Sequence, residues 1–191
     1  MRNGRREMPT IHGKGSHGKV IADALWGMSP KLGREIQWTD DTEGTRPAPD
    51  EYFIAAIGDN AARRNVGSQM TVIHPSAVVS PSAWIGPGSF VGAGAIVGPG
   101  ASIGLGAIIN TGAIIEHECI VGDWAHIASG AVLSGNVEVG EGTLIGAAAV
   151  VRRGQKVGAW ATIGCGASVV CDVPSGETWV GVPARLLKLG G

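Results

Sequence analysis

The chain is poor in charged residues. Asp, Glu, Lys and Arg make up 16% of its 191 residues, against about 25% in ordinary globular proteins. The net charge is only −1, which gives no electrostatic reason to expect a nucleic acid as a partner. The basic N-terminal residues are followed by no apolar segment long enough for a signal peptide or a membrane span. We therefore expect a cytoplasmic protein that does not insert into a membrane.

Cysteine and aromatic residues are also scarce, whereas glycine is abundant. Three cysteines in a chain without an export signal do not suggest a disulfide framework. Glycine accounts for 32 of the 191 residues, more than twice its usual share of about 7%. Because 44% of the residues are still hydrophobic, the composition argues against disorder and favours a repeat architecture.

The charged residues divide the chain into two parts. Residues 1–70 hold 19 charged side chains, whereas residues 71–191 hold 12. We place a domain boundary at this change of composition. The first part is expected to be a small α/β domain, and the second a repeat domain that ends in a short C-terminal tail.

The second part repeats with a period of six residues. From Ile73 to Val169 every sixth residue is aliphatic, and the residue four positions later is usually small. This period fits neither a helix nor an alternating strand, but it fits a parallel β-solenoid in which each hexapeptide is one short strand and one corner. The aliphatic side chains would point inward. The glycines that often follow them directly, such as Gly86 and Gly104, would supply the backbone angles of the corners.

A glycine-rich loop precedes an apparent helix in the first part. Gly13, Gly15 and Gly18 form the pattern G-x-G-x-x-G, which allows backbone N–H groups to approach a phosphate at a helix N-terminus. The loop also resembles a Walker A motif, but Val20 stands where a magnesium-binding Ser or Thr is required. A glycine turn without a ligand is the alternative interpretation.

Two further segments strengthen the nucleotide interpretation. Asp40 and Asp41 begin 22 residues after Gly18, about the distance at which a carboxylate can bond to a ribose hydroxyl. An apolar strand then begins at Phe53 and ends in a polar turn at Asn60. This order predicts a miniature Rossmann-like βαβ unit that is too short for a full dinucleotide domain.

Polar residues interrupt the glycine corners over residues 110–126. His117 is followed directly by Glu118, and a carboxylate beside an imidazole is a general-base arrangement. His126 lies half a turn further on, so we expect the two histidines on different edges of one prism. They would approach each other only across two chains. A structural histidine and a metal site are alternatives, although the spacing of His117, Cys119 and His126 is not that of a zinc finger.

A plain scaffold or an ice-binding solenoid would also explain the repeat, but not this polar interruption. Cys119 falls in an inward small-residue position, which core packing explains. Trp124 and Trp160 fall at corners, where they either contact another subunit or flank a ligand. The prism has too few charges to cover all its faces, which predicts a homotrimer.

The order of these motifs resembles the sialic acid O-acetyltransferase (NeuD/PglD-like) family of hexapeptide-repeat sugar acetyltransferases over nearly the whole chain. It is similar above all to the members that N-acetylate nucleotide-activated 4-amino-sugars of the bacillosamine and perosamine type. The matching segments are GSHGKV (15–20), DD (40–41), IGDN (57–60), IEHEC (115–119), AH (125–126), SGNV (134–137) and VGVPA (180–184).

The resemblance implies a left-handed parallel β-helix with a small N-terminal α/β domain, and direct acetyl transfer from acetyl-CoA without a metal. It implies that His117 is the general base and that Glu118 raises its basicity. The implied contacts of acetyl-CoA are His126, Gly135, Ala147 and Cys165, of which Gly135 would donate its N–H to the thioester carbonyl. The implied contacts of the nucleotide sugar are Gly15, Ser16, His17, Asp40, Asp41, Gly58 and Asn110.

Two alternative functions remain open at this point. One is O-acetylation of a sialic-acid-like sugar. The other is a solenoid that binds a nucleotide sugar without catalysing a reaction.

Overall fold

The computed structural model describes residues 9–29, 36–47 and 53–188. It begins with three short parallel strands in the order β2-β1-β3. A helix follows β1 and another follows β3, as predicted for a miniature βαβ unit. The elements in chain order are β1 (Thr10–His12), α1 (Ser16–Met28), β2 (Gln37–Thr39), the 3-10 helix η1 (Asp41–Glu43), β3 (Phe53–Ala55) and α3 (Asn60–Val66).

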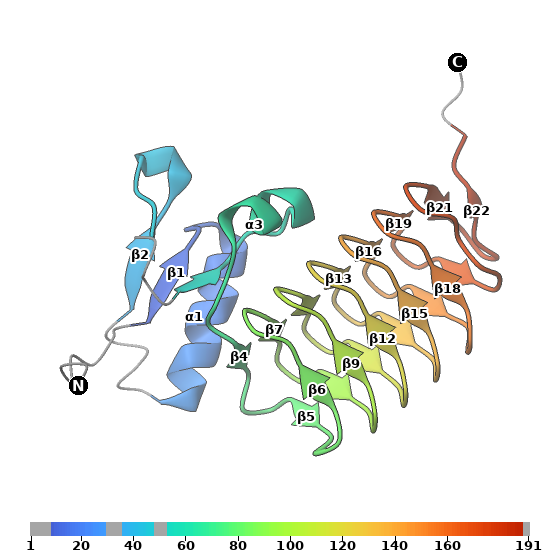
Figure 1. Cartoon of the computed structure of the whole chain (residues 1–191), viewed down its shortest axis with the longest axis horizontal. Coiled ribbons are helices and arrows are strands. Elements are labelled where there is room, and N and C mark those ends of the chain that lie inside the picture. The colour runs from blue at the N-terminus through green and yellow to red at the C-terminus, as the bar shows by residue number, and fades with distance from the viewer. Residues whose placement is uncertain (1–8, 30–35, 48–52, 189–191) are drawn as a thin grey trace.

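The remainder of the chain is a triangular prism of short strands (Figure 1). Strands that are 18 residues apart pair in parallel, as Ile109 does with Ile127. The first face consists of β4 (Val72–Ile73), β7 (Phe90–Val91), β10 (Ile108–Ile109), β13 (His126–Ile127), β16 (Leu144–Ile145), β19 (Thr162–Ile163), β21 (Thr178–Val180) and β22 (Arg185–Leu186).

Two further sheets complete the prism, which is a parallel β-solenoid as predicted. The second face consists of β5 (Val78–Val79), β8 (Ile96–Val97), β11 (Ile114–Ile115), β14 (Val132–Leu133), β17 (Val150–Val151) and β20 (Ser168–Val169). The third face consists of β6 (Trp84–Ile85), β9 (Ser102–Ile103), β12 (Ile120–Val121), β15 (Glu138–Val139) and β18 (Lys156–Val157). We name each edge of the prism by the two faces that it joins.

The interior of the prism is filled by the aliphatic residues of the period and by the small residues between them. Ile103, Ile115 and Ile127 are completely buried, and so are the alanines Ala113 and Ala125. The two kinds of residue form one continuous apolar cluster along the prism. The inward direction predicted for both is therefore confirmed.

The glycines that directly follow the aliphatic residues do not have the role predicted for them. Gly86 and Gly104 lack the positive φ of a left-handed residue, whereas Gly88 and Gly106, two positions later, have φ of +73° and +57°. A Cβ on Gly86 would lie 2.7 Å from the Gly104 carbonyl carbon, in the next turn. These glycines are therefore required by the close approach of successive turns, and the corner angles belong to different residues.

The α/β unit packs on the first face at the N-terminal end of the prism (Figure 1). Ile21 and Leu25 of α1 share a buried cluster with Val72, Phe90 and Ile108, which point outward from that face. The contact holds the glycine-rich loop and the turn after β3 close to the prism. Within the residues that the structure describes, no helix has the length and apolarity to cross a membrane.

Candidate active site

The three glycines of the loop after β1 have different roles. Gly13 has φ of +112°, and a Cβ there would lie 2.8 Å from the carbonyl oxygen of Ala56. A Cβ on Gly18 would collide with the Gly13 carbonyl and with the Trp38 ring, so this glycine allows α1 to pack closely. Gly15 has open space where a Cβ would be, and it begins α1 without a side-chain cap. The α1 N-terminus, which carries Ser16, can therefore be approached by an anion.

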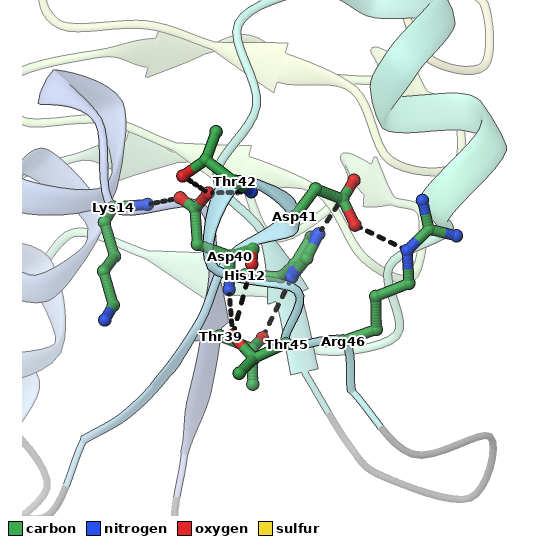
Figure 2. A network of polar contacts seen from close by, with 8 residues as sticks. All are labelled: His12, Lys14, Thr39, Asp40, Asp41, Thr42, Thr45 and Arg46. Atoms are coloured by element: carbon green, nitrogen blue, oxygen red, sulfur yellow. Dashed lines mark hydrogen bonds and ion pairs between the residues drawn. The ribbon is translucent and has the colours of Figure 1, made fainter.

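The two aspartates after β2 lie beside this loop (Figure 2). The Asp40 carboxylate accepts hydrogen bonds from the hydroxyl and N–H of Thr42 and from the N–H of Lys14, the last at 2.7 Å. These bonds, above all the one from the Thr42 hydroxyl, lower the pKa of Asp40 to about 2. The carboxylate is thus an anion that ties the glycine loop to the end of β2.

Asp41 faces a buried histidine that sequence reasoning did not identify. His12 accepts or donates a 2.9 Å hydrogen bond with the Thr39 hydroxyl, and its Nε2 lies 3.7 Å from Asp41 Oδ2. The other Asp41 oxygen pairs with Arg46 (Figure 2). No motif marked His12, because it lies in β1 before the glycine pattern begins.

An open cavity of about 300 Å³ lies beside the glycine loop and is lined by Lys14, Lys19 and Trp38. Both lysines belong to the glycine-rich segment. The Lys14 ammonium pairs with Glu43, whereas the charge of the exposed Lys19 fits a phosphate. The indole ring is a surface on which a nucleobase can stack. None of these three residues was predicted from the sequence, although the two lysines within a phosphate-loop pattern were a usable signal.

Four predicted residues meet where α1 and the turn after β3 contact the first face. The His17 ring lies 6.4 Å from the His126 ring, measured between centroids. Nε2 of His126 lies 3.1 Å from Nδ2 of Asn110, and the backbone of Gly58 lies close enough to act on the pKa of the same ring. We call these four residues the junction cluster. The resemblance assigned three of these residues to the nucleotide sugar and the fourth, His126, to acetyl-CoA, but the structure brings all four together.

Both histidines of the junction cluster are electrically neutral near pH 7. Burial, and then the positive charge of Arg63, lower the pKa of His17 to about 4. Burial, then the charge of Arg63 and then that of His17 lower the pKa of His126 to about 4. Within the described chain, the buried Nε2 of His17 has no hydrogen-bond partner, so this atom can still bond to a ligand.

His117 lies at the second–third edge of the prism. Its Nδ1 is 3.4 Å from Oε2 of Glu118, and both side chains reach solvent, with exposed fractions of 43% and 65%. The Nε2 end of the ring lies over Gly135, one turn later, where a Cβ would collide with it. The structure thus brings the predicted base, its carboxylate and Gly135 together.

The remaining predicted contacts of acetyl-CoA lie elsewhere. Ala147 and Cys165 stack at the first–second edge, where the carbonyl of Ala147 accepts a 2.8 Å hydrogen bond from Gly166. His126 is on the first face beneath the α/β unit. One chain therefore does not gather the predicted acetyl-CoA contacts, which are spread over a face and two edges.

Cys119 is buried in the prism core, as predicted. Its thiol donates to the carbonyl of Ser134 at 3.2 Å, and burial raises its pKa. The described ranges of the chain contain no group of three His, Cys, Asp or Glu side chains that could hold a metal ion.

Comparison with known proteins places this architecture in a family. The family model of the GMPPB C-terminal domain matches residues 68–155, and no curated protein matches the chain. The acetyltransferase domain of PglB from Neisseria gonorrhoeae FA1090 is 35% identical, with a TM-score of 0.86, over 95% of this chain and 100% of that domain.

Two other solved structures are similar over the same range. PerB from Caulobacter crescentus, solved with CoA and GDP-perosamine, is 33% identical, with a TM-score of 0.83, over 94% of this chain and 97% of PerB. WeeI from Acinetobacter baumannii AYE is 24% identical over 94% of this chain and 99% of WeeI, with a TM-score of 0.79, and shows the shared fold alone. The chain therefore belongs to the hexapeptide-repeat sugar acetyltransferase family that contains the PglB acetyltransferase domain and the perosamine N-acetyltransferase PerB.

Proposed function

We propose that the protein transfers the acetyl group of acetyl-CoA to the 4-amino group of a nucleotide-activated sugar. The observation that carries the proposal is the full-length similarity to two acetyltransferases of the family. The PglB domain has been solved with acetyl coenzyme A, and PerB with CoA and GDP-perosamine. The substrates of such a reaction are cytoplasmic metabolites, and we place the protein in that compartment.

The geometry at His117 supports its role as the general base. The ring nitrogen facing Glu118 can donate to that carboxylate, which leaves Nε2 to accept a proton from the attacking amine. Nε2 lies over Gly135, whose N–H donates no backbone hydrogen bond within the described chain. In the proposal, that N–H stabilises the negative charge that develops on the thioester oxygen. Acetyl-CoA supplies the acetyl group, and its thiolate is the leaving group.

The α/β unit is proposed to hold the acceptor, and the prism to hold acetyl-CoA. The open N-terminus of α1 at Gly15 and Ser16 suits a diphosphate, and the cavity beside Lys19 suits the nucleoside end. Asp41 is the exposed carboxylate proposed to bond to the ribose, beside the hydrogen-bonded Asp40. The junction cluster then lies at the sugar end, where the neutral imidazole of His17 has a free nitrogen.

A trimer would complete this site. From β5 to β17 the outward residues of the second face form an apolar stripe without a charge: Val78, Ile96, Ile114, Val132 and Val150. Only the last strand, β20, places a polar residue there, Ser168. Of the predicted acetyl-CoA contacts, Gly135 lies at one edge of this face, and Ala147 and Cys165 lie at its other edge. If the second face of each chain turns toward a threefold axis, the His117 edge of one chain meets the Cys165 edge of the next.

The test of the proposal is release of free thiol from acetyl-CoA. The purified protein is mixed with acetyl-CoA and, one at a time, with UDP-, GDP- and dTDP-linked 4-amino-sugars. Release with at least one of these sugars supports the proposal. Sialic acid is tested in the same way as a hydroxyl acceptor. Absence of release with every acceptor would support a solenoid that only binds a nucleotide sugar.

A further inference from the structure

Arg63 is a buried arginine without a carboxylate partner in the described chain. It lies in α3 and is only 1% exposed. Its Nε donates to the Gly106 carbonyl and its Nη1 to the Ile57 carbonyl, both at 2.9 Å, while Nη2 donates to Trp124 O at 2.6 Å and to Asn60 Oδ1 at 3.0 Å. All these acceptors are uncharged oxygens. A guanidinium in such a place bears a large desolvation cost, so attachment of α3 alone does not account for it.

The acceptors of Arg63 belong to segments that are distant in the sequence. Gly106 and Trp124 occupy the same corner of the third–first edge in successive turns, and Asn60 extends the contact to the Gly142 carbonyl in the turn after. Ile57 belongs to the turn after β3, directly before Gly58. Arg63 therefore fastens that turn to the prism beside the junction cluster, to which Gly58 belongs.

The charge of Arg63 also acts on the junction cluster. It is the second cause, after burial, that lowers the pKa of both His17 and His126. Asp59, at the N-terminus of α3, is a negative charge that acts on Arg63 itself. A neutral imidazole can accept a hydrogen bond at one ring nitrogen, whereas an imidazolium can only donate. The charge of Arg63 therefore adds to the effect of burial, which is the larger cause of the low pKa of both rings.

We infer that Arg63 is a positioning residue for the acceptor site: its hydrogen bonds lock the turn that carries Gly58 onto the prism beside His17 and His126. Its kinetic consequence rests on the proposed function, whereas its effect on the histidines does not. Arg63 touches neither the proposed base nor the cavity beside the glycine loop, and it acts on the acceptor only through its neighbours.

The test compares three variants in the same helix. Arg63→Met removes the charge and the hydrogen bonds. Arg63→Lys keeps the charge but loses the planar fork that reaches several carbonyls at once. Arg64→Met is the matched control, because Arg64 is exposed and pairs with Glu141 beside Trp160. Circular dichroism and sedimentation first establish which variants keep the native fold and assembly.

Titration of the histidine ring signals by NMR gives the readout that does not depend on activity. In Arg63→Met we expect both histidines to titrate higher by about half a pH unit or more, because a positive charge that lowers both pKa values is gone. Arg63→Lys and Arg64→Met should leave both titrations within about 0.2 units of the parent protein. If Arg63→Met does not fold, the kinetics of Arg63→Lys replace the histidine titration as the test.

The kinetic readout separates positioning from general damage. Arg63→Lys should raise the KM of the acceptor by about tenfold and leave the KM of acetyl-CoA within about twofold, while Arg64→Met changes neither. An unchanged acceptor KM in a folded Arg63→Lys, or unchanged histidine titrations in a folded Arg63→Met, would overturn the inference. A parent protein that releases no thiol with any acceptor contradicts the proposed function instead, and the NMR result then decides on Arg63 alone.

Discussion

Gly135 allows His117 to occupy its position. The two residues are one turn apart, and any Cβ at 135 would collide with the imidazole. The repeat thus places a backbone N–H beneath the ring that is proposed to accept the proton. The φ of Gly135 is not positive, so its backbone conformation does not require glycine. Glycine is required there because a side chain would collide with His117.

Replacement of His117 by alanine should lower kcat by roughly 10²- to 10⁴-fold, the usual scale for loss of a general base. Binding of acetyl-CoA, measured by calorimetry, should persist because most of its proposed contacts lie elsewhere. Glu118→Gln should lower kcat by a smaller factor, since Glu118 is proposed to orient the base and not to act as the base itself. Full turnover by an intact His117→Ala trimer would move the role of base to another residue.

Gly135→Ala tests the fit beneath the ring. The added methyl group must displace the imidazole, and a displacement of about 1 Å can cost roughly 100-fold in rate. We expect kcat to fall by about that factor while the unfolding midpoint changes little, because His117 is half-exposed and can move outward. A kcat equal to that of the parent protein would show that the ring position is not critical.

The buried histidines predict how stability depends on pH. The folded pKa of His17 and of His126 is about 4, below the ordinary value of about 6.5. Only the unfolded chain therefore takes up these protons as the pH falls from 6.5 toward 4, and the free energy of unfolding should decrease over that interval. Urea unfolding at pH 7.5 and pH 5 measures this loss, which is at most about 2 kcal/mol per histidine. In His126→Gln the loss should be smaller, and a pH-independent midpoint in the parent protein would contradict the burial of both rings.

At the scale of elements, the glycine loop and β2 form the proposed nucleotide site. Asp41→Ala and Lys19→Ala remove an exposed carboxylate and an exposed ammonium from either side of this loop. Each should raise the KM of the acceptor by about tenfold and leave that of acetyl-CoA nearly unchanged. Steady-state kinetics with one substrate varied at a time measures both. Equal effects on the two substrates would mean that the α/β unit only supports the fold.

The sequence predicted the elements better than it predicted the contacts between them. The period of six identified the strands of the prism, because an inward aliphatic residue such as Ile115 recurs in every strand. The role predicted for Gly104 was wrong. A glycine required by close contact between successive turns looks the same in the sequence as a glycine required by the backbone angles of a corner. Arg63 was not predicted at all, because burial of that side chain depends on carbonyls that lie 43 and 61 residues away in the chain.

At the scale of the whole molecule, the account depends on association of the chains. The apolar second face should lie at the interface, whereas the third face carries the exposed ion pair between Glu138 and Lys156. Val132→Asp on the second face should therefore give monomers in sedimentation and a loss of activity of about 100-fold or more. Ile120→Asp on the third face, where the side chain is 52% exposed, is the control and should remain trimeric and active. An active Val132→Asp monomer would contradict a site shared between chains.

The most direct test of the central claim uses two nucleotide sugars that differ only at C4, one with an amine and one with a hydroxyl group. Each is incubated with acetyl-CoA and the protein, and the product is identified by NMR. The account predicts an acetamide at C4 of the amino-sugar and no product from the hydroxyl analogue. An ester formed on the hydroxyl sugar, with the amine left unmodified, would contradict it.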